Sequence, residues 1–193
     1  MPFKAFYSIT VRDSRSRVIS RRRYLSRSYV EQFSRLLFNT FSTQAETAVD
    51  TGGTTRDLKT GDTSQLRLKT HALVDDSTYG LVVGTGTTAV AIADRALGTQ
   101  IAHGTGAGQL QHAAHQYTTT SVSGSTASFK LKRVFTNASG ASITVQEAGI
   151  YAGQYDTGST GRIFLIVRDI ISGGLAVPNG GAITIEYTVE VTV

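Results

Sequence analysis

Seven arginines near the start of the sequence offer the clearest chemistry in this chain. They are Arg12, Arg15, Arg17, Arg21, Arg22, Arg23 and Arg27. A guanidinium binds carboxylates and phosphates through paired hydrogen bonds, so the cluster fits an acidic protein surface or a nucleic-acid backbone. We favour docking to a protein partner, because only Arg21–Arg23 is contiguous and strand alternation directs neighbouring side chains to different faces. Nucleic-acid binding, with Tyr24 and Tyr29 stacking on bases, is the alternative.

Other candidate chemistry is sparse. His103, His112 and His115 have the spacing of potential zinc ligands, but no carboxylate lies between residues 101 and 129 to join them. The sequence contains no cysteine, no Gly-x-Ser-x-Gly and no His-Glu-x-x-His. Gly84-Thr85-Gly86 follows an apolar segment but lacks the third glycine of a dinucleotide site and the lysine of a phosphate loop. We therefore expect no catalytic residues, no metal, no cofactor and no enzyme activity.

Composition favours a subunit of an assembly. The chain has 193 residues, of which 40% are apolar and 17% are charged, whereas about 25% charged residues is usual. A surface of Thr, Ser, Gly and Ala needs little desolvation of charge when a neighbour covers it. Residues 1–35 hold nine Lys or Arg against Asp13 and Glu31, so the excess positive charge belongs to the N-terminal segment. No secretory signal or membrane-spanning segment is recognisable, and we expect no membrane partner.

Period-two alternation is the main structural signal. In residues 183–193, Ile, Tyr and Val alternate with Thr and Glu without a break, which predicts one long amphipathic strand. Further strands are predicted at 3–11, 18–25, 66–74, 81–83, 128–136, 143–151 and 163–171. One amphipathic helix is predicted to begin with a capping box formed by Ser28 and Glu31 and to end near Phe41. A second, short helix is predicted after Asp94, and residues 102–127 are predicted to form a long loop.

These elements predict a mainly β fold, an antiparallel β-sandwich or jelly-roll-like domain with an N-terminal hairpin and one amphipathic helix. We divide the chain into a basic hairpin and helix for docking (1–42), a Gly/Thr-rich linking arm (43–65) and the β-sandwich (66–193). No internal repeat is evident in the sequence.

Four stretches of the chain resemble a group of tailed-bacteriophage virion proteins. They are SITVRDSRSRVISRRRYLSRSYVEQFSRLLF with DTGGTTRDL, GLVVGTGTTAVAIADRALGTQIAHGTGAGQL, RVFTNASGASITVQEAGIYA and RIFLIVRDIISGGLAVPNGGAITIEYTVEVTV. The resemblance covers most of the sequence and supplies no catalytic residues. It implies a structural protein of the virion, such as a capsid decoration, a neck or collar subunit or a tail-associated protein. The density of arginines in residues 12–27 is heavier than such a segment needs.

We therefore expect a non-enzymatic virion subunit, assembled in the host cytoplasm. Its expected partners are other copies of itself, with a trimer as one arrangement, and capsid, portal-neck or tail proteins. One alternative is a receptor- or glycan-binding tail appendage, for which Tyr151, Tyr155 and Asn179 are the candidate contacts. The second alternative is a nucleic-acid-binding protein that uses the basic N-terminal segment.

Overall fold

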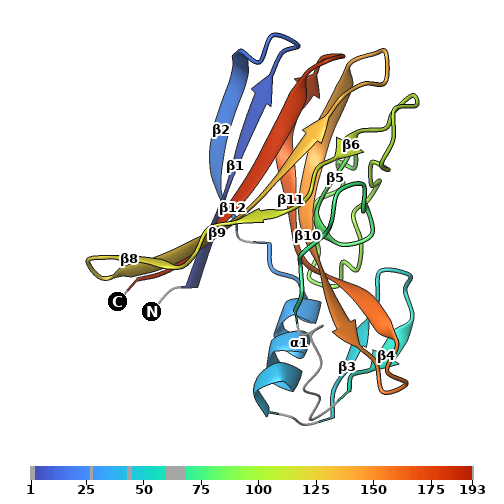
Figure 1. Ribbon diagram of the computed structural model, residues 1–193. Helices are drawn as coiled ribbons and strands as arrows, with labels where there is room; N and C mark the ends of the chain where they lie inside the picture. Colours follow the sequence, from blue (N-terminus) through green and yellow to red (C-terminus); the bar gives the residue numbers. More distant parts are fainter. Residues whose placement is uncertain (1–2, 27, 43–44, 60–67, 193) are drawn as a thin grey trace.

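The larger of the two main sheets is built from the strands with the clearest alternation. The computed structural model describes residues 3–26, 28–42, 45–59 and 68–192 (Figure 1). In the larger sheet the order is β2-β1-β12-β9-β6, and β7 and β8 also pair with β9. All pairings are antiparallel. The bounds are β1 (Phe3–Arg12), β2 (Val18–Ser26), β6 (Gln111–His112), β7 (Gln116–Tyr117), β8 (Ser121–Ser123), β9 (Thr126–Thr136) and β12 (Ala182–Thr192).

The second sheet, in the order β11-β10-β5, covers the inner face of the first (Figure 1). Its strands are β5 (Gly80–Gly84), β10 (Ile143–Tyr155) and β11 (Gly161–Val177). The nearly continuous apolar run in β11 predicts a deeply buried strand, and residues 164–169 are all buried. Side chains of both sheets, including Ile9, Ile185, Phe135, Val145 and Phe164, share one core. The predicted antiparallel β-sandwich is thus confirmed.

One helix, α1 (Glu31–Ser42), lies at one end of the sandwich next to a small sheet of β3 (Thr47–Val49) and β4 (Thr55–Asp57) (Figure 1). The predicted capping box is wrong. The amide of Glu31 donates to the carbonyl of Ile92, and the Ser28 hydroxyl binds Asp169 instead. A carbonyl distant in sequence therefore accepts the hydrogen bond of the first helical amide.

Several predicted segments differ from the structure. The short helix expected after Asp94 is absent from the described residues, where turns occur instead. The expected arm (43–65) contains the β3–β4 hairpin, and the expected long loop contains β6, β7 and β8. Residues 68–74 form no strand, and residues 66–67 lie outside the described part. The β1–β2 hairpin belongs to the larger sheet, although the sequence placed the start of the sandwich at residue 66.

Candidate functional site

The outward-facing side of the larger sheet is cationic. Strand register aligns Arg23, Ser8, Glu186 and Lys132 in one row across β2, β1, β12 and β9. The neighbouring rows on the same side contribute three more cations. We call this surface the cationic face and define it by Arg12, Arg21, Arg23, Lys130 and Lys132.

Two shallow hollows of about 500 and 400 Å³ lie on the cationic face. Arg21, Arg23 and Lys130 line the first hollow, and Arg12, Arg21 and Lys132 line the second. Between the cations, both hollows are lined by Ser8 and by one acidic residue, Glu186. The hydroxyl residues Thr10, Thr184 and Thr188 each line one of the two hollows. Cations and hydroxyls spread over a shallow surface can bind carboxylates or phosphates of a macromolecule.

The cationic side chains of this face differ in the contacts that they form within the protein. Lys130 forms an ion pair of 3.0 Å with Glu186. The Arg23 guanidinium lies over the Phe6 ring, 4.6 Å from its centroid. Within the described residues, neither Arg21 nor Lys132 has a side-chain hydrogen bond or ion pair. Their charge is therefore available to an anionic partner.

The three contiguous arginines separate as strand alternation predicts. Arg21 and Arg23 lie on the cationic face, whereas Arg22 shares the inner side of the sheet with Ile9. The Arg22 guanidinium donates to the carbonyl of Ser172 over 2.8 Å, which ties the edge of one sheet to the other. Among the described residues, Arg22 therefore has a side-chain hydrogen bond to the other sheet, which Arg21 and Arg23 lack.

The remaining predicted arginines lie at or near the β1–β2 turn. Arg17 pairs with Asp13 at 2.8 Å, and Arg15 donates its amide to the same carboxylate. Arg12 belongs to the cationic face, and its guanidinium also donates to the carbonyl of Ser16 in this turn. Arg27 lies outside the described residues. The structure thus brings Arg12, Arg21 and Arg23 together and leaves Arg15, Arg17 and Arg22 off this face.

A buried carboxylate organises the loop after β5. Glu147 is fully buried, and its carboxylate lies 2.8 Å from the Arg168 guanidinium, which also binds Asp94 at 2.8 Å. Burial raises the pKa of Glu147, but hydrogen bonds from the Thr99 amide, the Arg168 side chain and the Gly98 amide outweigh it and hold the pKa below its usual value. Gly86 also donates its amide to Glu147. The Gly84-Thr85-Gly86 segment thus binds the carboxylate of Glu147 and not an external phosphate.

A buried guanidinium binds backbone carbonyls in the same way that Glu147 binds backbone amides. Arg133 is fully buried and donates to backbone carbonyls of the segments around it: Leu73, Asp76, Tyr79, Leu81 and Ala113. These carbonyls belong to β5 and to the loops that precede and follow it in the sequence. The Arg133 side chain therefore holds together segments that have little regular secondary structure. Alternation alone places residue 133 on the inner face, where a charge is not expected.

Two of the three candidate histidines, His112 and His115, are buried, whereas His103 is partly exposed. Burial, followed by the charge of Arg133, lowers the pKa of His112 to about 4 and that of His115 to about 3, so both rings are neutral at pH 7. His115 accepts a hydrogen bond from the Leu81 amide, and His103 accepts one from the His112 amide. Within the described ranges, no three His, Asp or Glu side chains form a group that could hold a metal ion.

A second buried carboxylate has only hydroxyl partners among the described residues. Asp169 accepts hydrogen bonds from Ser26 at 2.8 Å and from Tyr187 at 3.0 Å, and the Tyr187 ring stacks on that of Tyr7. Burial raises the pKa of Asp169, although the bonds from Ser26, Ser28 and Tyr187 oppose that effect. Ionisation of Asp169 is therefore less favourable in the folded protein than in the unfolded chain.

We expect Asp169→Asn to gain stability relative to the wild type as pH rises. The folded-state pKa of Asp169 is raised, so its contribution is complete below the unfolded-state pKa and declines as pH rises through the folded-state value. Urea unfolding of both proteins between pH 4.5 and 8 measures the difference. A difference that is constant with pH would contradict the assignment. Asp57→Asn, at an exposed position, is the control.

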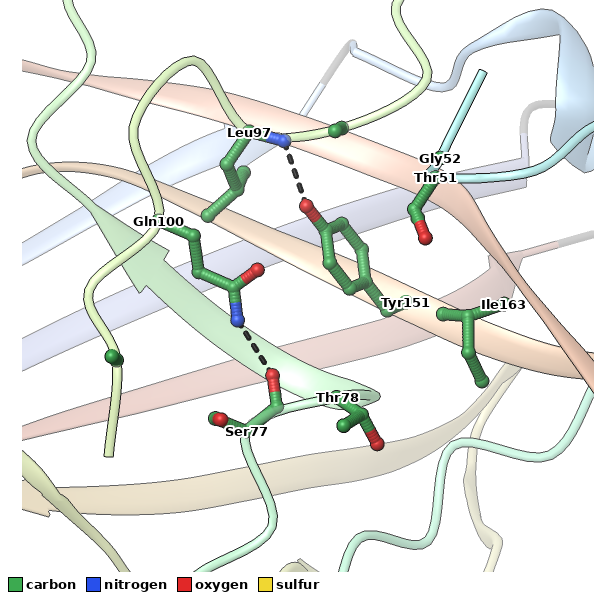
Figure 2. Close-up of a pocket in the computed structure, with 10 residues that line it drawn as sticks. Thr51, Gly52, Ser77, Thr78, Leu97, Gln100, Tyr151 and Ile163 are labelled. Atoms are coloured by element: carbon green, nitrogen blue, oxygen red, sulfur yellow. Dashed lines mark hydrogen bonds between the residues drawn. The ribbon is translucent and has the colours of Figure 1, made fainter. Parts of the chain in front are cut away.

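A separate pocket of about 630 Å³ lies between β10, β11 and the loops that carry Thr51, Ser77 and Leu97 (Figure 2). Tyr151 enters it from β10, and its hydroxyl accepts a hydrogen bond from the Leu97 amide over 2.8 Å. Gln100 donates to the carbonyl of Ser77 over 2.6 Å. The Tyr151 side chain is only 3% exposed, so its ring does not offer an open face for stacking on a sugar.

The three residues suggested for glycan binding do not share one groove. Tyr151 lines the pocket of Figure 2, and Tyr155 ends β10 beside the β3–β4 hairpin. Asn179 lies in the β11–β12 turn, where its side chain accepts a bond from the Gly140 amide. The three residues that we considered for a receptor- or glycan-binding appendage therefore lie in separate parts of the structure.

The chain contains a short internal repeat, so the prediction of no internal repeat is wrong. Residues 50–56 read DTGGTTR and residues 156–162 read DTGSTGR. In both turns the aspartate accepts a bond from a threonine amide at 2.9 Å, in Asp50–Thr54 and Asp156–Thr160. Each aspartate also pairs with an arginine across the hairpin, at 2.7 Å for Arg56 and 2.8 Å for Arg162. A comparison of the sequence with itself finds this signal without a structure.

The two repeated hairpins also contact each other reciprocally. The Thr51 amide donates to the Ile163 carbonyl at 2.9 Å, and the Thr157 amide donates to the Asp57 carbonyl at 2.8 Å. These four positions correspond in pairs within the two repeats, so the hairpins pack about a local pseudo-twofold axis. The repeat thereby joins the β3–β4 hairpin to the end of the sandwich.

Comparisons with protein families, with curated proteins and with solved structures found no match to this chain. In the part of the chain that the structure describes, no helix has the length and apolar character needed to cross a bilayer.

Proposed function

We propose that this chain is a non-enzymatic structural subunit of a bacteriophage virion. It assembles with copies of itself and docks on an acidic surface of a capsid, portal-neck or tail protein through the cationic face. The observation that carries the proposal is the division of charge in the molecule. Glu147, Arg168 and Arg133 are buried and form hydrogen bonds within the protein. In contrast, Arg21 and Lys132 on the cationic face have no side-chain partner among the described residues.

The shape of this face favours a macromolecular partner. Its two hollows are shallow, and their cations come from three strands, β1, β2 and β9, rather than converging on one point. Small ligands instead require a concave site with convergent polar groups. The resemblance to tailed-phage virion proteins supports the choice of a virion partner.

Reversing charge on the cationic face should weaken docking. We expect Arg21→Glu with Arg23→Glu to reduce cosedimentation with shells, connectors or tails of a tailed phage about tenfold or more, because charges at a docking surface act by attraction and exclusion. Wild-type binding should also fall as salt is raised. Light scattering of the free protein checks the self-association.

Arg95→Glu with Lys59→Glu makes the same change of charge away from this face and should bind as the wild type does. Unchanged binding by Arg21→Glu with Arg23→Glu would contradict the proposal. Retention on DNA that is lost in this variant, without binding to any virion fraction, would favour the nucleic-acid alternative.

A further inference from the structure

The two main sheets have four outer edges, and three of them are covered. On β11, the segment 28–30 pairs with residues 166–168, where the Val30 amide donates to Ile166 at 3.3 Å and the Arg168 amide donates to Ser28 at 3.2 Å. Further along β11, the side chains of Tyr7 and Arg22 donate to the carbonyls of Ile170 and Ser172.

The edges of β5 and β9 are covered in other ways. Along β5, the Thr85 amide donates to the Thr99 carbonyl at 2.8 Å, and the Ile101 amide donates to the Val83 carbonyl at 2.9 Å. The outer side of β9 is paired in turn by β6, β7 and β8, each of two or three residues. Short edge strands and covering segments are the usual protection against pairing with another chain.

The edge of β2 is different. This nine-residue strand pairs with β1 alone among the described residues, and no backbone bond from its other side is found there. In an antiparallel pair, alternate residues direct their amide and carbonyl groups away from the partner. A row of backbone groups is therefore open to solvent along the outermost strand of the sheet (Figure 1).

The side chains on this edge determine which strand can pair with it. Arg21 and Arg23 are exposed on one side of β2, with Arg22 on the other. A second copy of β2 would bring arginine against arginine, and like charges opposite each other destabilise strand pairing. An acidic strand would instead place carboxylates next to Arg21 and Arg23, where guanidiniums bind them through paired hydrogen bonds.

We propose that an extended acidic segment of a protein partner adds to the open edge of β2 as a further strand of the larger sheet. This inference rests on the proposed function, since it specifies how the cationic face docks. Backbone hydrogen bonds along β2 supply affinity, and acidic side chains at alternate positions supply selectivity by meeting Arg21 and Arg23. The partner strand extends the larger sheet by one strand and places its carboxylates beside Arg21 and Arg23.

A synthetic peptide tests this mode of binding. The probe is a capped seven-residue peptide in which Glu alternates with Thr, and its controls are the same peptide with Lys for Glu and the Glu peptide N-methylated at alternate residues. We expect the Glu peptide to slow amide hydrogen exchange in residues 20–25 at least tenfold at saturation. The Lys peptide should not bind, and N-methylation should remove the protection because it removes backbone donors.

Arg21→Glu with Arg23→Glu reverses the preference and should bind the Lys peptide instead of the Glu peptide. Failure of the Glu peptide to protect residues 20–25, or equal affinity of the N-methylated peptide, would overturn strand addition. If virion fractions still bind the wild type in a manner that depends on Arg21 and Arg23, the proposed function stands and only the strand-addition mode is wrong. If the peptide protects β2 but no virion fraction binds, the proposed function is wrong.

Discussion

Replacing Glu147 with alanine should lower the free energy of unfolding by about 3–5 kcal/mol, the usual cost of breaking a buried ion pair. The substitution leaves the Arg168 guanidinium without its buried partner and removes the acceptor of three backbone amides. The glycines of the loop are close to the carboxylate, and a Cβ added at Gly84 would lie 2.5 Å from Glu147 Oε1. Urea unfolding followed by circular dichroism measures the loss.

The acid side of the pH profile gives an independent readout for Glu147. Its folded-state pKa is lowered, so the stability that it contributes is complete above the unfolded-state pKa and is lost as pH falls through the folded-state value. Glu147→Gln should flatten this part of the profile. Glu46→Gln, at a partly exposed ion pair with Arg35, should change stability by less than about 1 kcal/mol. Equal effects of the two substitutions would contradict the role of Glu147.

Replacing Arg133 with methionine should also cost about 3–5 kcal/mol, through a different mechanism. Methionine fills the space of the side-chain stem but donates no hydrogen bond, so the buried carbonyl of Leu81 and the partly buried carbonyl of Ala113 lose their donor from this residue. Each buried polar group that is left without a partner costs about 1–3 kcal/mol. Thermal unfolding monitored by calorimetry measures the total effect.

Arg133→Lys separates the charge from the geometry of the guanidinium. An ammonium keeps the positive charge, but it cannot reach carbonyls on several segments at once, so we expect an intermediate loss. Arg15→Met in the exposed β1–β2 turn is the matched control and should be close to neutral. If Arg133→Lys is as stable as the wild type, the positive charge stabilises the fold, and the multiple hydrogen bonds of the guanidinium are not required.

The interior of this protein is more charged than its composition implies. Glu147, Arg168, Asp169 and Arg133 are all buried, although only 17% of the chain is charged. Glu147, Arg168 and Arg133 form hydrogen bonds with segments outside the long strands. Asp169 links β11 to Tyr187 of the other sheet. The buried charges thus position irregular segments that have few apolar residues of their own.

The long strands could be predicted because their signal is local. The alternation of residues 183–193 corresponds to β12, and the apolar run of residues 163–171 corresponds to the buried part of β11. The separation of Arg21 and Arg23 from Arg22 also followed from period two. The turn repeats at Asp50 and Asp156 were present in the sequence and were missed, because a seven-residue repeat is short.

The sequence by itself determined the mainly β class, the long strands and the faces on which the consecutive arginines lie, because alternation acts within a single strand. Only the tertiary structure decided that β1 pairs with β12, that Glu147 meets Arg168 and that Arg133 reaches the carbonyls around Leu81. It also decided that, within the described residues, no second strand covers the outer edge of β2. These features depend on the order of strands in the sheets and on which loops cover them, and no spacing within one segment specifies contacts between residues that are distant in sequence.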